Sequence, residues 1–286
     1  MTRPWTLRWL VGRVLLYAAV ALFVVATLLP VLWMLIVSVA PPADLTAKPL
    51  RFIPSTIDWG NYVRLLTFTP NSPGAAFLAA LRNSLTVALV GTAISLAVAI
   101  PAAWCFSRSR GRYDALLYGV LSTYMMPAVA LLLPLYFLLA TLGLLNSVTG
   151  LIIVYCSVLT PFVTWFAKSA IDAVPEEIES AAQIDGAGFF QLLRHVTLPL
   201  ARAGIATAAL FAILLAWDEF FYALLFTATA DAKTLTVTIA DFAGGRATDF
   251  GLVAAAGLLT ALPPVLIAFV LQKALVSGLT AGSVKG

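Results

Sequence analysis

The sequence predicts an all-α integral membrane protein, organised as one domain over residues 1–286 with six transmembrane helices. Of its residues 62% are hydrophobic and 10% are charged, whereas soluble domains carry about 25% charged residues. Six apolar runs are long enough to cross a hydrocarbon core of about 30 Å. Because backbone polar groups in lipid must be satisfied within their own segment, these runs are expected to be helices: 14–39, 84–106, 115–139, 148–167, 204–226 and 250–271.

The first three runs differ in their flanks and in their proline content. The run 14–39 follows three arginines, as a signal peptide would, but its apolar core is too long for one and a retained helix is expected. The run 84–106 contains no charged residue. The run 115–139 contains Pro127 and Pro134, which fall on one helical face. Such prolines kink a helix, which suits a moving gate, although membrane helices also tolerate proline without that role.

Of the last three runs, 148–167 and 250–271 contain no charged residue, whereas 204–226 carries Asp218 and Glu219. Ionisable groups at membrane depth are costly and usually face a cavity, a partner or the interface. Neighbouring residues of a helix point about 100° apart, so the two carboxylates are not expected to share a pathway. Cavity lining is favoured for Asp218, with interfacial anchoring as the alternative. For Glu219 the preference is reversed.

The distribution of positive charge predicts the orientation. Six spans place both termini on one side of the membrane. If that side is the cytoplasm, eleven of the seventeen lysine and arginine residues lie inside, three of them packed into the short loop at 108–112. This asymmetry favours cytoplasmic termini. It also places the loops 40–82 and 227–249 outside and the polar segment 175–199 inside.

The segment 175–199, PEEIESAAQIDGAGFFQLLRHVTLP, is a polar interruption between two apolar runs. Pro175 suits the first turn of a helix, and the glutamates that follow suit the positive end of the helix dipole. Gly186 allows a tight turn, after which a second short helix at 189–195 is expected, with Pro199 closing the unit. Such a helix–glycine–helix projection fits a groove on another protein, whereas the plainer alternative is an amphipathic loop on the membrane surface.

The same segment resembles the coupling loop, or EAA motif, of permease subunits in binding-protein-dependent ABC importers. The maltose-type carbohydrate-uptake branch has the pattern E-x-A-A-x-x-D-G-A and then a spaced Leu-Pro, which stands here as 179–187 and 198–199. The stretch AWDEF at 216–220 is similar to A-W-N-[DE]-[FL] in the fifth helix of that branch, with Asp218 where Asn is more usual. The ending GLTAGSVKG at 278–286 looks like the tail of MalG-like permeases.

This resemblance implies a type I ABC importer permease fold in a bacterial cytoplasmic (inner) membrane and a subunit that is not an enzyme. The sequence has no G-x-x-x-x-G-K-[ST] motif, so ATP and Mg²⁺ are expected on partner ATPase subunits and no cofactor on this chain. The implied partners are a second homologous permease, two ATPase subunits, an extracytoplasmic solute-binding protein, a sugar-like substrate and the lipid membrane, without nucleic acid. The residues implied in ATPase coupling are Glu179, Ala181, Ala182, Asp185, Gly186, Phe189, Phe190 and Pro199.

The resemblance also implies roles for two other segments. In the MalG-like branch the tail inserts between the ATPase subunits, so ATPase contacts are implied for Gly282, Ser283, Val284 and Lys285, although a disordered terminus is the plain alternative. The outer loop 227–249 would reach into the binding protein. Gly244 and Gly245 would let its tip enter a narrow cleft, unless the loop is only a solvated connector.

A substrate path is expected to use residues that can contact hydroxyl groups and sugar faces. Tyrosine and tryptophan suit this task because they join an apolar plane to a polar tip, although ordinary packing is an alternative for each aromatic residue. The candidates are Asn83, Tyr124, Tyr155, Trp217, Asp218 and Tyr222.

The predicted function is therefore the membrane-spanning permease subunit of an ATP-driven importer for a sugar or sugar-like solute, such as an oligosaccharide, a glycoside or a polyol derivative. The rival is an ion-coupled secondary transporter in which Asp218 and Glu219 bind the coupling ion. The two halves of the sequence show no convincing repeat, and a coupling loop would have no use in such a transporter.

Overall fold

The computed structural model describes residues 7–281 apart from positions 50, 110 and 245–247, and every regular element in this part of the chain is helical. Five helices are long and apolar enough to cross a membrane, and a bent pair makes a sixth span if it counts as one. The predicted all-α membrane fold is confirmed. In chain order the elements are α1 (Leu7–Val39), α2 (Pro42–Leu45), α3 (Gly60–Leu66), α4 (Pro73–Arg108), α5 (Asp114–Tyr124), α6 (Ala128–Thr141), α7 (Val148–Asp172), α8 (Glu176–Ile184), α9 (Phe189–Leu192), the π-helical turn η1 (Leu193–Thr197), α10 (Leu198–Asp218), α11 (Phe221–Phe226), α12 (Leu235–Ala243) and α13 (Phe250–Ala281).

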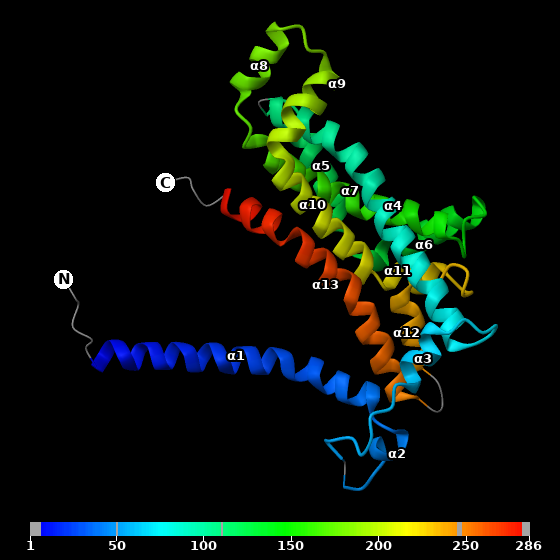
Figure 1. Ribbon diagram of the computed structural model, residues 1–286. Coiled ribbons are helices and arrows are strands. Elements are labelled where there is room, and N and C mark those ends of the chain that lie inside the picture. The colour runs from blue at the N-terminus through cyan, green and yellow to red at the C-terminus, as the bar shows by residue number, and fades with distance from the viewer. Residues whose placement is uncertain (1–6, 50, 110, 245–247, 282–286) are drawn as a thin grey trace.

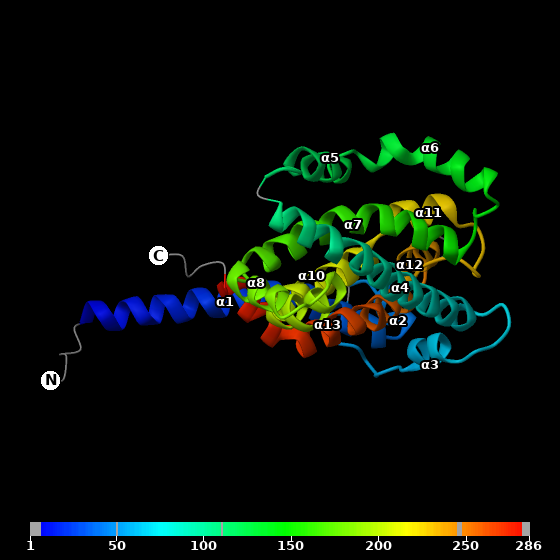
Figure 2. The same cartoon turned by 90° about the horizontal axis from the view of Figure 1, so that it is seen from above.

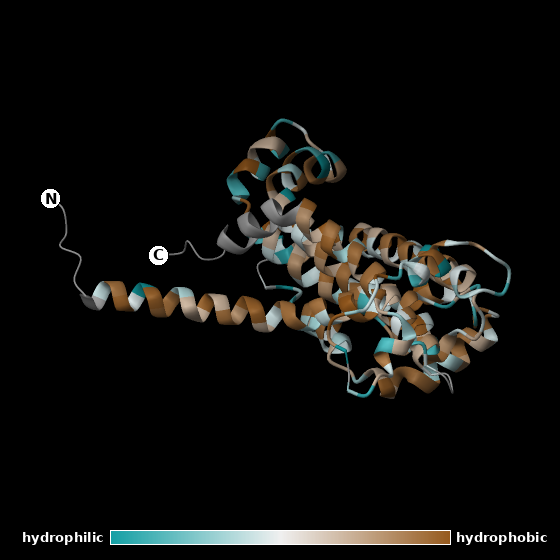
Figure 3. Ribbon diagram, turned by 60° about the horizontal axis from the view of Figure 1, so that its bottom comes forward, coloured by the Kyte–Doolittle hydropathy of each residue, from teal (hydrophilic) through white to brown (hydrophobic). Residues whose placement is uncertain are grey.

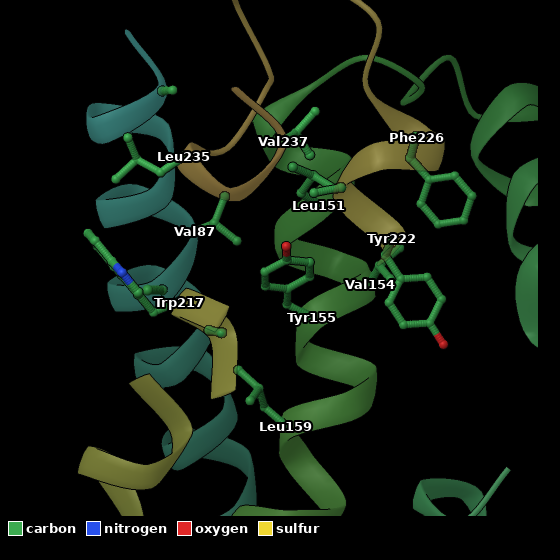
Figure 4. Close-up of a cluster of buried hydrophobic side chains, with 14 of the residues drawn as sticks. Val87, Leu151, Val154, Tyr155, Leu159, Trp217, Tyr222, Phe226, Leu235 and Val237 are labelled. Carbon is green, nitrogen blue, oxygen red and sulfur yellow. The ribbon is translucent and has the colours of Figure 1, made fainter. Parts of the chain in front are cut away.

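The centre of the bundle is the pair α4 and α7, which pack along their length beside α10 (Figure 1). Small residues of α4 allow the close approach: Ala88 and Ala99 are fully buried, and Gly91 lies against Tyr155 of α7. In lipid, such packing of small residues is a principal source of helix association. Tyr155 lies between α7 and α4, whereas Tyr222 of α11 lies on the other side of α7 (Figure 4).

The third span is broken rather than kinked. α5 ends at Tyr124, α6 begins at Ala128, and the two helices meet at 90°. Pro127 directly precedes α6 in an extended conformation, and a proline disfavours the helical conformation in the residue before it. Pro134 lies inside α6 without ending it. The expectation of one helix over 115–139 is wrong. The helix is interrupted next to Pro127, whereas it continues through Pro134.

The fifth span is also broken. α10 ends at Asp218, Glu219 is extended (φ −65°, ψ 126°), and α11 starts at Phe221. The expectation of one helix over 204–226 is therefore wrong. The argument that the side chains of Asp218 and Glu219 point about 100° apart on one helix falls with it, because Glu219 lies outside both helices.

Pro199 does not close the unit 175–199, contrary to the prediction. A helical run continues from Phe189 to Asp218 through η1. In η1 the N–H of Leu198 donates to the carbonyl of Leu193, five residues back. Such a π turn widens the helix where the ring of a following proline would otherwise clash with the preceding turn. The second short helix therefore leads directly into the membrane.

Both segments expected as outer loops contain helical structure. α4 begins at Pro73, well before the expected start at 84, and Ser72 caps it by accepting a hydrogen bond from the N–H of Ala75. α12 lies within 227–249, and its residues Leu235 and Val237 are buried against the bundle. This part of the second loop is packed structure and not a solvated connector.

α1 extends away from the rest of the molecule and touches it mainly through α13 (Figures 1 and 2). Its most apolar stretch is not buried inside the molecule, and hydrophobic residues run along it (Figure 3). In a membrane this surface is available to lipid or to a neighbouring membrane helix.

Candidate functional site

The polar segment 175–199 stands at one end of the bundle, and α2, α3 and α12 lie towards the other (Figure 1). α8 begins directly after Pro175 and carries three glutamates in its first turn, where the positive end of the helix dipole favours carboxylates. The expected first helix of this segment is therefore present, although Pro175 precedes it at the N-cap position and does not lie in its first turn.

Gly186 makes the turn that ends α8. Its φ is +87°, and its N–H donates to the carbonyl of Gln183, while the N–H of Ala187 donates to the carbonyl of Ala182, both at 3.0 Å. This pair of bonds is the Schellman closure of a helix, which requires a residue that tolerates the left-handed conformation. The tight turn assigned to Gly186 is confirmed.

The outward face of α8 and α9 exposes several apolar side chains beside the charged Glu177 and Asp185. At 100° per residue, Ala181 and Ile184 lie about 200° and 140° around the helix from the inward-facing Glu179, and so on its opposite side. Ile184 exposes 86% of its surface and Phe190 exposes 79%, with Ile178 also largely exposed. An apolar patch on an otherwise polar projection marks an interaction surface. We call the set Ile178, Ala181, Ile184 and Phe190 the outer patch.

Glu179, by contrast, points inward and is 3% exposed. Its Oε2 accepts hydrogen bonds from Nε of Arg108 at 2.8 Å and from Nε1 of Trp104 at 3.3 Å, and its Oε1 accepts from Oγ1 of Thr197 at 2.6 Å. Glu179 was predicted to take part in ATPase coupling, but its carboxylate is bound by side chains of this chain itself. Sequence reasoning missed these three partners. The one sequence signal is that Trp104 and Arg108 are four residues apart and so share one face of α4, which does not by itself identify Glu179 as their partner.

Burial raises the pKa of Glu179, but the hydrogen bonds from Arg108 and Thr197 and the charge of Arg108 outweigh it and hold the pKa below its ordinary value of 4.5. A carboxyl with a lowered folded-state pKa stabilises the fold above its unfolded pKa and loses that contribution as the pH falls through the folded value. We therefore expect the melting-temperature difference between wild type and Glu179→Gln to be full above about pH 4.5 and to shrink on further acidification. Glu177→Gln, an exposed change on the same helix, is the control; a Glu179→Gln difference that stays constant in acid would contradict the assignment.

The remaining coupling candidates are exposed or half-buried, and Phe189 also makes a contact within the chain. Asp185 is exposed and Ala182 is half-buried. Phe189 packs edge-on against Trp104, with ring centroids 5.2 Å apart, and thereby fixes α9 to α4. Pro199 lies in the first turn of α10. Phe189 therefore positions the segment, whereas the outer patch is the surface that the segment presents.

A second cluster forms at the break between α10 and α11. Glu219 accepts hydrogen bonds from the N–H groups of Tyr222 and Ala223, at 2.8 and 3.2 Å, and from the hydroxyl of Tyr155 at 2.5 Å. Its carboxylate thus satisfies the first donors of α11, where the helix dipole favours negative charge. Glu219 was expected as an interfacial anchor, and the structure instead makes it the cap of an internal helix. Tyr155 supports this cap by donating its hydroxyl hydrogen bond to the same carboxylate.

The other path candidates are mostly committed to the fold. Asn83 is 1% exposed, and its Nδ2 lies within 3.0–3.3 Å of the carbonyls of Ala230, Asp231 and Lys233, which ties α4 to the loop before α12. The indole Nε1 of Trp217 donates to the carbonyl of Thr260 in α13. The structure does not bring the six candidates together on one surface.

Two path candidates are exposed, Asp218 at the end of α10 and Tyr124 at the end of α5. The latter packs against Phe162 of α7. Both exposed side chains therefore lie where a long span breaks, and they stay predicted contacts of the substrate.

Gly244 ends α12 with φ −84°, a conformation open to any residue, so a special need for glycine is not evident there. Gly245 and the tail residues Gly282, Ser283, Val284 and Lys285 lie outside the described residues. Another contact of the same loop was not anticipated: Oδ1 of Asn146 accepts hydrogen bonds from the N–H groups of Ala228 and Thr229, which joins the loop to the turn before α7.

Residues 91–281 match the family of proteins described as the binding-protein-dependent transport system inner membrane component. The chain is 33% identical over 286 residues to the sulfoquinovosyl glycerol transport system permease protein of Agrobacterium fabrum, covering 100% of this chain and 98% of that protein. It is 34% identical over 277 residues to the trehalose/maltose transport system permease protein of Thermococcus litoralis, covering 96% and 97%.

The fold is similar to a chain in the crystal structure of a bacterial ABC transporter involved in the import of the acidic polysaccharide alginate. The TM-score is 0.81 at 21% identity, over 95% of this chain and 99% of that chain. A bacterial alginate ABC transporter in complex with an alginate pentasaccharide-bound periplasmic protein matches with a TM-score of 0.61 at 18% identity, over 92% of each chain. At these identities the likeness is one of fold.

Proposed function

Because the chain belongs to the family of binding-protein-dependent transport system inner membrane components, we propose that it is a permease subunit that is driven by a separate ATPase through residues 175–199. It is a sugar-importing ABC permease of the inner membrane and catalyses no reaction of its own. This family assignment decides against an ion-coupled transporter. Glu219 also has its carboxylate occupied by the cap of α11.

The observation that carries the coupling proposal is the outer patch. It lies on a polar segment at the opposite end of the bundle from α2, α3 and α12, and it is held outward because Glu179 is fixed inward on the other side of α8. Two subunits of the ATPase, with ATP and Mg²⁺, would receive this chain and a homologous second permease. Closure of the ATPase pair would then draw together the coupling segment of this chain, residues 175–199, and that of the second permease. The membrane helices would follow as rigid bodies.

The proposed cargo is an oligosaccharide, a glycoside or a polyol derivative. Two relatives are named as permeases for sulfoquinovosyl glycerol and for trehalose and maltose, and these compounds share rings rich in hydroxyl groups. The exposed carboxylate of Asp218 would accept hydrogen bonds from such hydroxyls, and the ring of Tyr124 would offer an apolar plane with a polar tip. A soluble binding protein would deliver the cargo to the end that carries α12, with the loop 227–249 as its contact.

The test is sugar uptake by the complete complex in proteoliposomes, with ATP inside and the binding protein outside. We expect uptake to require ATP, and uptake driven by an ion gradient alone would overturn the proposal.

The Gly186→Leu variant should weaken ATPase copurification about tenfold, because a side chain in the left-handed conformation costs roughly 1–2 kcal/mol. Gly188→Ala is the matched control, since Gly188 has φ −74° and its added Cβ meets only the Gln191 side chain at 3.9 Å. Gly186→Asn should retain most binding, because asparagine tolerates this conformation.

A further inference from the structure

Arg108 is the last residue of α4, and its guanidinium is committed to partners from several elements. Nε and Nη2 bind the two carboxylate oxygens of Glu179, at 2.8 and 3.2 Å, in the two-point geometry that guanidinium and carboxylate favour. Nη2 also donates to the carbonyls of Ile171 and Val174, where α7 ends, at 3.2 and 2.9 Å. The side chains of Arg108 and Glu179 are 13% and 4% exposed. The pair is therefore largely shielded from water and has few ways to rearrange.

The contacts around this pair extend its reach. Nη1 of Arg108 donates to Oγ of Ser107, whose hydroxyl donates to Oδ1 of Asp172 in α7 at 2.6 Å. One turn earlier on α4, Trp104 donates to the same Glu179 carboxylate and packs against Phe189 of α9. α4, the end of α7, α8 and α9 thus meet at one buried carboxylate.

The chain itself offers no direct link between α8 and α4. α8 is joined in sequence to α7 on one side and, through α9 and η1, to α10 on the other. α4 belongs to an earlier part of the chain and ends 68 positions before α8 begins, at 108 against 176. A displacement of α8 can reach α4 directly only through side-chain contacts, and the contacts with Arg108 and Trp104 are the hydrogen bonds from α4 to Glu179.

We propose that Arg108 is a positioning residue that delivers the motion of the coupling segment to α4, the central helix of the bundle. The inference rests on the proposed function, since it presumes that an ATPase moves α8. The bidentate bond makes α8 and the cytoplasmic end of α4 one rigid unit, and the bonds to the end of α7 include that helix. Without Arg108, α8 still presents its outer patch, but its remaining hydrogen bond from α4 is the longer one from Trp104, at 3.3 Å. The movement of α8 then reaches the membrane mainly through the connection at 173–175 and through η1.

The experiment uses the complete complex in proteoliposomes and measures ATPase copurification, ATP hydrolysis and sugar transported per ATP. For Arg108→Gln we expect copurification and hydrolysis to persist while transport per ATP falls about tenfold, a typical effect of changing a residue that couples two sites. Arg108→Lys, which keeps the charge and loses the fork, should fall between wild type and Arg108→Gln. Arg112→Gln is the matched control, because Arg112 lies four positions after Arg108, is exposed, and has its guanidinium over the ring of Tyr113.

The double variant Arg108→Gln/Glu179→Gln addresses misfolding. It leaves no unpaired buried charge, so it should be more stable than either single variant while transport per ATP stays low, because amides cannot replace the bidentate bond. Spin labels at Arg82→Cys on α4 and Gln183→Cys on α8, in a cysteine-free background, should show a narrow distance distribution that broadens in Arg108→Gln and not in Arg112→Gln.

Three results would overturn the inference. Unchanged transport per ATP in Arg108→Gln would show that α4 receives the motion by another route, and the proposed function would stand. Loss of ATPase copurification in Arg108→Gln and in the stable double variant would make Arg108 part of the docking surface instead. If the wild-type complex takes up sugar without ATP, the proposed function fails and this inference fails with it.

Discussion

Replacing Glu219 by leucine is expected to destabilise the chain by about 2–5 kcal/mol, because it leaves buried hydrogen-bond donors without an acceptor, at roughly 1–3 kcal/mol each. The donors are the N–H groups of Tyr222 and Ala223 and the hydroxyl of Tyr155. Inside a membrane no water replaces the lost partner. α11 should then lose its start, and with it the packing of Tyr222 and Phe226 against the bundle. The measurement is the midpoint of thermal unfolding in detergent, together with the yield of folded protein.

Glu219→Gln separates the structural role from a role in ion binding. Its amide oxygen can still accept from a backbone N–H, and its NH₂ group can donate to the Tyr155 oxygen, so most of the stability should remain. ATP-driven transport should remain with it. Asp218→Asn is the neighbouring control for stability alone, since Asp218 is exposed and makes none of these hydrogen bonds in the described structure. A Glu219→Gln protein that is stable but unable to transport would point to a chemical role for the carboxylate and contradict the capping assignment.

The two broken spans show how far the sequence predicts local structure. The break before α6 has a visible cause in Pro127, although Pro134 carries the same chemical signal and lies within an intact helix. The break between α10 and α11 has no proline or glycine at 218–221. It is stabilised by Glu219 and by Tyr155, which is 64 positions away in the chain. A contact of that range leaves no periodic signal, so the cap could only be found in the structure.

The coupling segment was more predictable because most of its structure is local. Proline, the glutamates of the first turn and the glycine of the closing turn act on their own neighbours. The glutamates and the glycine are found where local rules place them, and Pro175 lies one position before the first helical residue. The direction of Glu179 was not predictable in the same way, because its strongest partner is 71 positions earlier. The early start of α4 is a different case. Ser72 followed by Pro73 is a recognisable helix start, and it was overlooked because hydropathy alone defined the spans.

Replacing Phe190 by aspartate is expected to weaken ATPase binding at least about 30-fold, the effect of removing a dominant aromatic contact from an interface. Phe190 is 79% exposed, so the substitution has little effect on the fold of the chain itself and its cost falls on the complex. Ile184→Asp should act in the same direction, because Ile184 is 86% exposed on the same outer patch.

The matched control is Ile53→Asp, at a residue equally exposed (84%) in the loop after α2, at the other end of the bundle. Membrane insertion and thermal stability should match wild type in all three proteins, whereas ATPase copurification and ATP-driven uptake should fall only for Phe190→Asp and Ile184→Asp. Equal binding by Phe190→Asp and wild type would remove the outer patch from the interface and leave the role of α8 to its polar face.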